Sequence, residues 1–371
     1  MIDGTVTLNS CDVTGHTGLN TGGGVYLVGS GGVSNLDWTG GMVAGNTAVN
    51  NGAGLYMSGG TASLHGVTFD DNSPAPGGGI TYGGGAYFGG VTFAADSLVF
   101  TGNSAGIGGG LNLQDCPQAD LSHSVLTGNT ASYLGGGLNF QNNPSGTLSG
   151  NTAAANVGAG LGGGGIYVTG VTPAMEHNLM AFNTGGTTFG NGLVVGSAPA
   201  VFSCNDAYGN AGADYTGFPD PTGTDGNISV DPVFCDAAGG NYGLKSTSPC
   251  TAANNPGCGL IGALDVCAAS PVPDEGDVPA AFRVAGNYPN PFNPRTVIRF
   301  DLVKEAPTRV VVFDLAGRKV KTLLEDVRPA GSHEVAWNGD DTQGRAAAAG
   351  VYFYMVTSGD NTAVGRMALV K

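Results

Sequence analysis

Basic residues are nearly absent from the first 270 residues of this chain, which hold fifteen aspartates and one glutamate but a single base, Lys245. A surface without Lys or Arg cannot neutralise phosphate groups, so nucleic acid binding through this region is excluded. A lyase acting on uronate polymers needs a base to take a proton and cations to hold the carboxylate, and neither precedes Lys245. The region is therefore expected to be a binding or structural unit rather than an enzyme.

Several other signals are missing as well. No apolar run approaches the roughly 20 residues that cross a bilayer, so no transmembrane segment is predicted. The chain has no paired C-x-x-C of a zinc ribbon, no Ser/His/Asp arrangement and no nucleotide fingerprint, so no motif predicts a metal or an organic cofactor. Met1 to Gly4 leads directly into a strand-like phrase without a charged or apolar leader. We therefore expect earlier repeats and a signal peptide to precede this sequence.

Two phrases alternate about every 27 residues between residues 22 and 192. The first is a glycine cluster followed by a short apolar strand, as in Gly83 to Phe88 (GGGAYF). The second is apolar-x-x-Asn, and its copies end at Asn46, Asn72, Asn103, Asn129, Asn151 and Asn183, with His16 in the first slot. Each unit is too short to bury its own apolar face, so the units must stack around one continuous core.

A right-handed parallel β-helix of about eight coils is the fold that this repeat favours. Leu55 and Met57 alternate with Tyr56, which is the period of a strand with one face inward. Glycine supplies corners with positive φ. The recurrent asparagines are expected to adopt the left-handed conformation at one corner and to bond their counterparts in the next coil.

The alternation of glycine clusters with Phe-x-x-Asn, as in Phe69 to Asn72 and Phe100 to Asn103, resembles the repeats of chlamydial polymorphic outer-membrane proteins and other bacterial surface β-helices. The likeness covers residues 5 to 210. It implies a secreted or surface-displayed rod with a pectin-lyase-like fold. It carries over no catalytic residue, because those repeats are structural.

A change in composition separates a second domain from the repeats. Residues 271–371 hold twelve acids and twelve bases, so the whole net charge of −15 lies on the first part. Residues 268–281 are rich in Pro, Ala and acids and predict an extended linker between a β-helix over 1–267 and a domain over 282–371. Alternating apolar residues around Val310 and Val351 predict strands of a small sandwich there.

The second domain carries an ordered set of motifs, namely Tyr288-Pro289-Asn290-Pro291-Phe292-Asn293-Pro294, Gly317-Arg318, Trp337 and Gly350-Val351-Tyr352. Their order resembles the C-terminal sorting domain of type IX secretion cargo, which is related to the immunoglobulin-like domain of flagellar hook-capping proteins. The likeness implies an immunoglobulin-like β-sandwich whose partner is the type IX secretion machinery of a Gram-negative bacterium. It also implies export across the outer membrane, followed by anchoring at the surface or release. Trp337 is expected in the core.

Residues 226–267 resemble the closing coils of many bacterial right-handed β-helix proteins, in phrases such as Asn227 to Phe234 and Leu260 to Ala263. Such an end is expected to cover the open apolar cross-section of the rod.

Five of the seven cysteines lie between residues 204 and 267. An exported protein meets an oxidising compartment, so disulfides are expected, with Cys235–Cys250 and Cys258–Cys267 as the favoured pairs. The remaining two, Cys11 and Cys116, lie on coils about 14 Å apart at the usual strand spacing and cannot bridge. They are expected to be small buried residues.

Two groups of acids are candidates for chemistry. Asp70 and Asp71 are adjacent, but neighbours on a strand point to opposite faces, so solvated turn residues are expected. The remaining candidates, Asp37, Asp96 and Asp120, precede their coil's asparagine by seven to nine residues and could stack into an acidic stripe that holds calcium or a sugar.

The histidines of the repeats are expected to face solvent. His65, His123 and His177 lie on alternate coils, and at roughly 9 to 10 Å they cannot share one metal ion. Glu176 and His177 are neighbours on a strand, so they are expected to face opposite sides.

Two functional classes remain open. The favoured class is an exported, non-catalytic surface protein whose β-helix binds extracellular polysaccharide or other surfaces, with neutral sugars bound on a Tyr- and Asn-bearing outer face. The other is a polysaccharide-degrading enzyme, a lyase or a glycosidase, whose site lies in earlier coils or in an acidic groove.

Overall fold

The computed structural model describes residues 4–29, 34–77, 79–186, 188–267, 282–288, 290, 292, 294–315, 317–359 and 361–370. Within these residues the regular structure is β-strand, apart from one short 3-10 turn, η1 (Ala237–Gly239). The chain divides into two compact units, Met1–Ala268 and Ala269–Lys371. The predicted linker, 268–281, lies outside the described residues.

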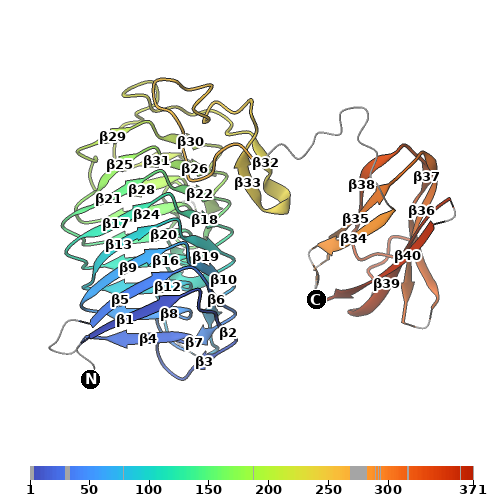
Figure 1. Cartoon of the computed structure of the whole chain (residues 1–371), viewed down its shortest axis with the longest axis horizontal. Coiled ribbons are helices and arrows are strands. Elements are labelled where there is room, and N and C mark those ends of the chain that lie inside the picture. The colour runs from blue at the N-terminus through green and yellow to red at the C-terminus, as the bar shows by residue number, and fades with distance from the viewer. Residues whose placement is uncertain are drawn as a thin grey trace. The chain divides into compact units, whose positions relative to one another are not determined.

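The first unit is a rod of stacked coils with four faces, and each regular coil contributes one strand to each face (Figure 1). The first face holds β1 (Gly4–Asn9), β5 (Ser34–Thr39), β9 (Thr61–His65), β13 (Thr92–Asp96), β17 (Ala119–Ser122), β21 (Gly146–Ser149), β25 (Ala174–Glu176) and β29 (Phe202–Ser203). The second face holds β2 (Val13–Thr14), β6 (Met42–Ala44), β10 (Thr68–Asp70), β14 (Val99–Thr101), β18 (Val125–Thr127), β22 (Thr152–Ala154), β26 (Leu179–Ala181) and β30 (Asp206–Tyr208).

The other two faces complete each coil. The third face holds β3 (Thr17–Gly18), β7 (Thr47–Ala48) and β11 (Ser73–Pro74), followed by β15 (Ser104–Ile107), β19 (Thr130–Leu134), β23 (Val157–Gly158) and β27 (Thr184–Gly185). The fourth face holds β4 (Val25–Val28), β8 (Leu55–Ser58), β12 (Ala86–Gly89), β16 (Leu111–Gln114), β20 (Leu138–Gln141), β24 (Ile166–Thr169), β28 (Leu193–Val195) and β31 (Tyr215–Thr216).

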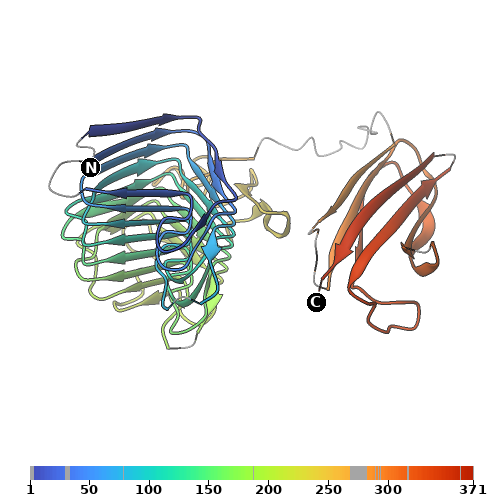
Figure 2. The same cartoon turned by 90° about the horizontal axis from the view of Figure 1, so that it is seen from below.

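Paired strands on each face are parallel, and Figure 2 shows the stacked coils from below. The sheet of the third face is interrupted between β11 and β15. Leu55 pairs with Val25 of the preceding coil and with Ala86 of the next. Leu55 and Met57 are fully buried, whereas Tyr56 between them is half-buried on the outer side. The predicted parallel β-helix, with its core inside the coils, is confirmed.

Glycine clusters mark the corner between the third and fourth faces, for two separate steric reasons. Gly83 has φ 64°, a conformation that L side chains rarely adopt. A Cβ on Gly84 would lie 2.2 Å from the Ser104 carbonyl oxygen and 2.5 Å from that of Gly109. The second glycine is therefore required by close contact with the backbone of the next coil.

A ladder of buried asparagines follows the corner between the second and third faces. Asn103 Nδ2 donates to the Phe69 carbonyl oxygen (2.9 Å) and to Asn129 Oδ1 (3.0 Å). Its own Oδ1 accepts from the backbone N (3.1 Å) and Nδ2 (2.9 Å) of Asn72. The ladder comprises Asn46, Asn72, Asn103, Asn129, Asn156, Asn183 and Asn210. The backbone N–H of His16 donates to Asn46 Oδ1, so His16 holds the first slot through its main chain.

The assignment of Asn151 to this ladder was wrong. Asn151 donates to Asn178 Oδ1 (3.0 Å) in a second ladder, which lies at the corner between the first and second faces. This ladder comprises Ser124, Asn151, Asn178, Asn205 and Asn227. The two corners are confused in the sequence because both follow an apolar strand and turn through the same kind of bend.

The left-handed residue at these corners is the one before the asparagine, not the asparagine itself. Asp71 (φ 49°) precedes Asn72, and Phe182 (φ 55°) precedes Asn183. The asparagine side chain is thereby free to point into the core and to bond along the rod.

Aromatic residues close the C-terminal end of the core. Phe202, Tyr215 and Phe218 pack edge to face, with ring centroids 5.3 to 5.8 Å apart, against the last coil. These rings cover part of the cross-section that residues 226–267 were expected to cover.

Residues 226–267 begin by stacking on the last coil, where Asn227 continues the second ladder and Ile228 pairs with Asp206. From Phe234 onward they lie along the outside of the second face. Their short hairpin of β32 (Phe234–Asp236) and β33 (Asn241–Leu244) and the buried Ile261 pack with Leu179 in a separate apolar cluster. Gly262 N donates to the His177 carbonyl oxygen (2.7 Å), which ties this segment to the coil beside it.

Two disulfides hold this segment, Cys204–Cys258 and Cys235–Cys267. Disulfide formation in this region is confirmed, but both favoured pairs were wrong, and Cys250 is a buried free thiol. The error arises because the segment does not follow the repeat, so spacing along the sequence does not give proximity. Cys11 and Cys116 are free, with Cys116 buried and Cys11 only partly so.

The second unit is a sandwich of two antiparallel sheets. One sheet holds β34 (Arg283–Tyr288), β35 (Thr296–Leu302) and β38 (Gly331–Trp337). The other holds β37 (Lys319–Arg328), β36 (Ala306–Asp314), β39 (Gly350–Ser358) and β40 (Asn361–Leu369). Trp337 is fully buried between them, as expected. Across the described parts of both units, no helix is long and apolar enough to cross a membrane.

We predict that Asn129→Ala lowers the free energy of unfolding by about 3 kcal/mol or more, because it leaves buried donors and acceptors of three coils unpaired. Asn35→Ala, which removes two hydrogen bonds between solvent-exposed side chains, should cost well under about 1 kcal/mol. Chemical denaturation followed by circular dichroism measures both. Equal effects of the two substitutions would contradict the structural role of the ladder.

Candidate functional site

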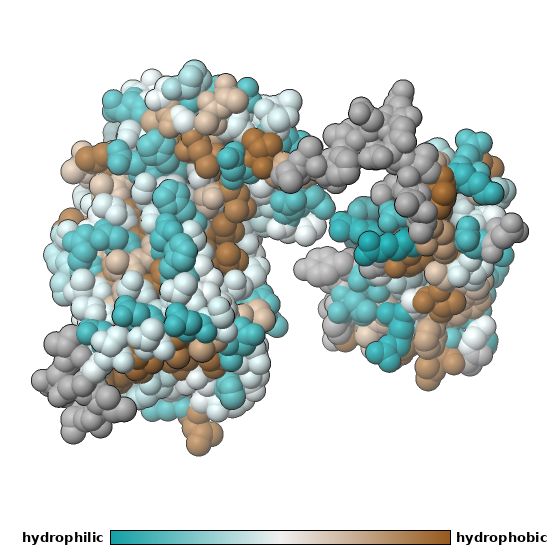
Figure 3. All heavy atoms as spheres, in the orientation of Figure 1, coloured by the Kyte–Doolittle hydropathy of each residue, from teal (hydrophilic) through white to brown (hydrophobic). Residues whose placement is uncertain are grey.

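The outer side of the first face carries polar side chains in rows that run from coil to coil. Asn35 Nδ2 donates to Thr5 Oγ1 (3.3 Å), and Thr147 Oγ1 donates to Asp120 Oδ1 (2.8 Å). The side of the rod seen in Figure 3 is mostly polar or neutral, with apolar residues in narrow strips. Polar groups on this face are thus largely bonded to one another.

Asp96 lies between two histidines of the neighbouring coils. Its carboxylate is 3.2 Å from His65 Nδ1 and 2.8 Å from His123 Nδ1. Ser97 Oγ and Ser122 Oγ also donate to it, at 2.8 and 2.9 Å. Burial acts to raise the pKa of Asp96, but the hydrogen bonds from His123 and the two serines outweigh it and lower the pKa to about 2. Asp96 therefore stays ionised over the whole physiological range.

The acidic stripe predicted from Asp37, Asp96 and Asp120 is not formed. Asp37 and Asp120 share one row but are separated by Ser63 and Ala94, while Asp96 lies in the next row. Among the described residues, no three or more His, Cys, Asp or Glu side chains are arranged to hold a metal ion. These three acids therefore do not combine into the stripe that could have held calcium or a sugar.

The histidines differ from one another. The side chains of His65 and His123 are 62% and 61% exposed, as expected of surface residues. His177 Nε2 instead lies 3.0 Å from the Cys258 carbonyl oxygen, so it contacts the closing segment and is not free on the surface. Glu176 beside it accepts from Ser203 Oγ (3.0 Å).

Asp70 and Asp71 do not form a facing pair of acids. Asp70 is the last residue of β10, and Asp71 lies at the following corner with positive φ. Burial, and then the charge of Asp71, raise the pKa of Asp70.

The fourth face bears the tyrosines and asparagines predicted to bind sugars. Tyr26, Tyr56 and Tyr87 stack on one another, with ring centroids 5.4 and 5.0 Å apart. Their ring faces are thus largely occupied by each other. Asn112 and Asn139, which continue the column, are 0% and 1% exposed. Tyr26, at the end of the stack, is 56% exposed, and the expectation that this face binds sugars stays a prediction.

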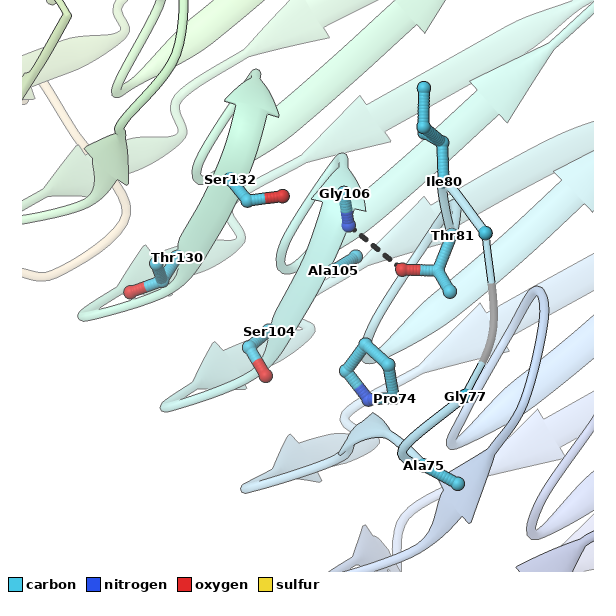
Figure 4. Close-up of a pocket in the computed structure, with 11 residues that line it drawn as sticks. Pro74, Ala75, Gly77, Ile80, Thr81, Ser104, Ala105, Gly106, Thr130 and Ser132 are labelled. Atoms are coloured by element: carbon cyan, nitrogen blue, oxygen red, sulfur yellow. Dashed lines mark hydrogen bonds between the residues drawn. The ribbon is translucent and has the colours of Figure 1, made fainter.

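A groove of about 420 Å³ lies on the third face, over β11, β15 and β19 (Figure 4). Hydroxyl groups of Ser104, Thr130 and Ser132 line it, together with the apolar side chains of Pro74 and Ile80. No charged residue is among its lining residues. The groove can therefore offer hydrogen bonds and apolar contact without net charge.

Residues 74, 75, 77 and 79–81 form one wall of this groove. Gly106 N donates to Thr81 Oγ1 (2.8 Å), and Ile107 N donates to the Thr81 carbonyl oxygen (2.9 Å). The groove was not predicted from the sequence, although the sequence contains a signal for it. The 31 residues from Asn72 to Asn103 form one of the longest ladder steps, and the extra residues build the wall.

The motif residues of the second unit serve mainly its packing. Phe292, Trp337 and Tyr352 are buried, and the Trp337 ring lies 5.4 and 5.0 Å from the other two ring centroids. Gly317 has φ 76° in the turn after β36, and Arg318 Nε donates to Asp314 Oδ2 (2.7 Å). Pro289, Pro291 and Asn293 lie outside the described residues, and of Tyr288 only the backbone is described.

Three further motif residues stand at the edges of the sheets. Asn290 Oδ1 accepts from Ala368 N (2.9 Å), which places it beside β40. Gly350 begins β39, and Pro294 is exposed just before β35.

A buried acid lies beneath the closing segment. Asp206, in the last coil of the second face, accepts from Val230 N and from the Cys250 thiol, both at 3.1 Å. Burial raises the pKa of Asp206 to about 7, and burial also raises the pKa of the Cys250 thiol. The carboxyl group is therefore partly protonated near neutral pH.

Two family models match the chain. Residues 2–178 match the right handed beta helix region, and residues 293–362 match the FlgD Ig-like domain. The chain is thus an all-β protein in which a right-handed parallel β-helix precedes an immunoglobulin-like domain. No curated protein matches it.

Two solved structures from Porphyromonas gingivalis show local likeness. PorZ, described as an essential bacterial surface component of the type-IX secretion system, is 25% identical over 24% of this chain and 12% of its own, with a TM-score of 0.18. Dimeric latent PorU is 21% identical over 26% of this chain and 10% of its own, with a TM-score of 0.21. The chain spans about a tenth of the length of these proteins, and at such TM-scores the likeness supports no inference.

We predict that Asp206→Asn removes a pH dependence of stability. Because the folded pKa is raised to about 7, the neutral carboxyl stabilises the fold fully below its unfolded pKa near 4, and this contribution is lost as the pH rises through 7. At pH 8 the variant should be more stable than the parent by a free energy of unfolding on the order of a few kcal/mol, and should therefore melt at a higher temperature. At pH 4 it should not be more stable than the parent. Calorimetry at both pH values measures this.

Asp37→Asn, on the exposed first face, is the matched control and should leave the profile unchanged. A lower melting temperature of Asp206→Asn at pH 8 would show that the buried carboxylate stabilises the fold.

Proposed function

We propose that this chain is an exported bacterial surface protein whose β-helix binds a neutral extracellular glycan without cleaving it, and whose C-terminal domain directs type IX secretion. The observation that carries the binding role is the uncharged, hydroxyl-lined groove on the third face. It lies on a rod with almost no basic residues, which disfavours every strongly anionic ligand.

The absence of a catalytic set around the groove supports a binding role. A glycosidase needs two carboxyl groups across the scissile bond, and the groove lining contains none. Of the acids on the first face, Asp96 is held by hydrogen bonds from neighbours in the same and adjacent coils. Such an arrangement keeps the carboxylate charged and does not raise its pKa toward the range that general acid–base catalysis needs.

The proposed export role rests on the motifs of the second unit and on its immunoglobulin-like family match. Since Phe292, Trp337 and Tyr352 form the core, recognition by a secretion machinery would fall to groups on the surface. Arg318, whose side chain is 82% exposed at the turn after β36, is one such group. We propose that the folded domain, rather than an unfolded tail, is what the machinery recognises.

Export is tested by deleting residues 282–371 in a type IX-competent host, with both proteins expressed behind a signal peptide. The full chain should reach the cell surface, and the truncated chain should remain in the periplasm. Surface labelling and fractionation measure this, and protease resistance of the truncated β-helix controls for misfolding. Undiminished surface display of the truncated chain would rule the role out.

Lyase activity is tested with the full chain incubated with pectate and alginate in the presence of calcium. Because the rod lacks a base and cations for the uronate, no unsaturated product absorbing in the ultraviolet should form. Calcium-dependent cleavage that is abolished by Asp70→Asn with Asp71→Asn would replace the binding role with an enzymatic one and make that pair its site.

A further inference from the structure

The third face carries hydroxyl groups at the spacing of its coils. Ser104 pairs with Thr130 across β15 and β19, so their side chains lie one coil apart, about 4.8 Å along the rod. In the described part of the chain, the hydroxyl groups of Ser104, Thr130 and Ser132 have no hydrogen-bond partner. These hydroxyls are available to a ligand, and each can both donate and accept.

The part of the wall formed by Ile80 and Thr81 is held against β15. A Cβ on Gly106 would lie 2.8 Å from the Thr81 carbonyl oxygen and 2.9 Å from Ile80 Cγ2, so wall and floor are in close contact. Thr81 is 4% exposed and bonded to β15, while Ile80 is 58% exposed at the rim. This part of the groove is thus preformed, which lowers the entropy that binding would cost.

A second hollow, of about 310 Å³, lies farther along the same face. Its lining includes Thr188, Phe189 and Thr216 and again contains no charged residue. The coil between the two hollows contributes Gly158, Ala159 and Gly160. None of these residues carries a side chain larger than a methyl group, so no bulky side chain of theirs separates the hollows. The hollows therefore lie along one track that runs parallel to the rod axis.

The chemistry of this track favours a sugar chain over a polypeptide. A bound peptide strand needs free backbone partners at a sheet edge. The third-face sheet is interrupted between β11 and β15, but the N–H groups on that side of β15 are already bonded. Ser104 N donates to the Asn72 carbonyl oxygen, and Gly106 N and Ile107 N both donate to Thr81. A neutral sugar needs hydroxyl partners and small apolar surfaces for its C–H groups, and both line the groove. The coil spacing is also comparable to the length of one sugar unit in an extended chain.

We propose that one neutral hexose chain binds along the third face, parallel to the rod axis, with its main subsite in the groove at Ser104, Thr130 and Ser132 and an outer subsite at Thr188. This assignment rests on the proposed glycan-binding function and adds to it the site, the direction of the chain and the neutral class of ligand.

The test is isothermal titration of the full-length protein with cellohexaose, laminarihexaose and mannohexaose, with hexagalacturonate as the acidic probe. Three variants are compared with the parent. Ser132→Trp fills the groove, Thr188→Trp fills the outer hollow, and Ser63→Trp places the same bulk on the exposed first face as a control. Circular dichroism confirms that each variant is folded.

At least one neutral hexasaccharide should bind and hexagalacturonate should not. Ser132→Trp should weaken the neutral ligand about tenfold or more, and Ser63→Trp should leave it unchanged. Thr188→Trp should weaken the hexasaccharide and not the corresponding trisaccharide.

The failures are distinguishable. Neutral binding that survives Ser132→Trp would overturn the site and leave the glycan-binding function standing. Equal binding of hexagalacturonate would overturn the neutral class. Equal loss of the trisaccharide and the hexasaccharide with Thr188→Trp would overturn the axial direction. No binding of any of the three neutral hexasaccharides would overturn both the site and the function.

Discussion

The rod depends on the hydrogen bonds that the side-chain amide of one asparagine per coil makes at the corner between the second and third faces. Backbone N–H and C=O groups at this corner are buried, and leaving one of them without a hydrogen bond lowers the stability of the fold by about 1–3 kcal/mol. An asparagine supplies a donor and an acceptor together, so Asn129 bonds both the Phe100 carbonyl of the preceding coil and Asn156 of the next. The ladder thereby fixes how each coil sits on its neighbour, and with it the register of all four faces.

That register determines what the surfaces of the rod can carry. Equivalent positions of successive coils lie above one another, so a polar residue on one coil meets the same position of the next. On the first face this brings His65, Asp96 and His123 together from three coils. On the third face it sets hydroxyl groups at a constant spacing beside a wall that only one coil provides. The regular stacking of the coils thus produces rows of side chains that bond to one another. The longer loop of one coil adds a groove in which a ligand can fit.

The sequence predicted the parts of the fold that repeat, and it failed where the repeat ends. Alternation such as Leu55-Tyr56-Met57 predicted the strands and the core, because inward and outward positions follow from local geometry. Asn151 was misplaced because two different corners share one local pattern. The partners of Cys235 and Cys258 depend on how a non-repeating segment folds back along the second face, which local sequence does not encode. The groove was missed because it depends on an insertion packed against the next coil, as Thr81 is against Gly106.

The start of the second unit is paired with its end. Phe292 N donates to the Ala368 carbonyl oxygen, and Val370 N donates back to that of Phe292, both at 2.9 Å. Asn290 adds two side-chain bonds to the same strand, to the Arg366 carbonyl and from Ala368 N. The contacts join residues 76 and 78 positions apart, so they cannot form until β40 is in place. Completion of this domain therefore depends on contacts between residues far apart in the sequence, which form late in folding.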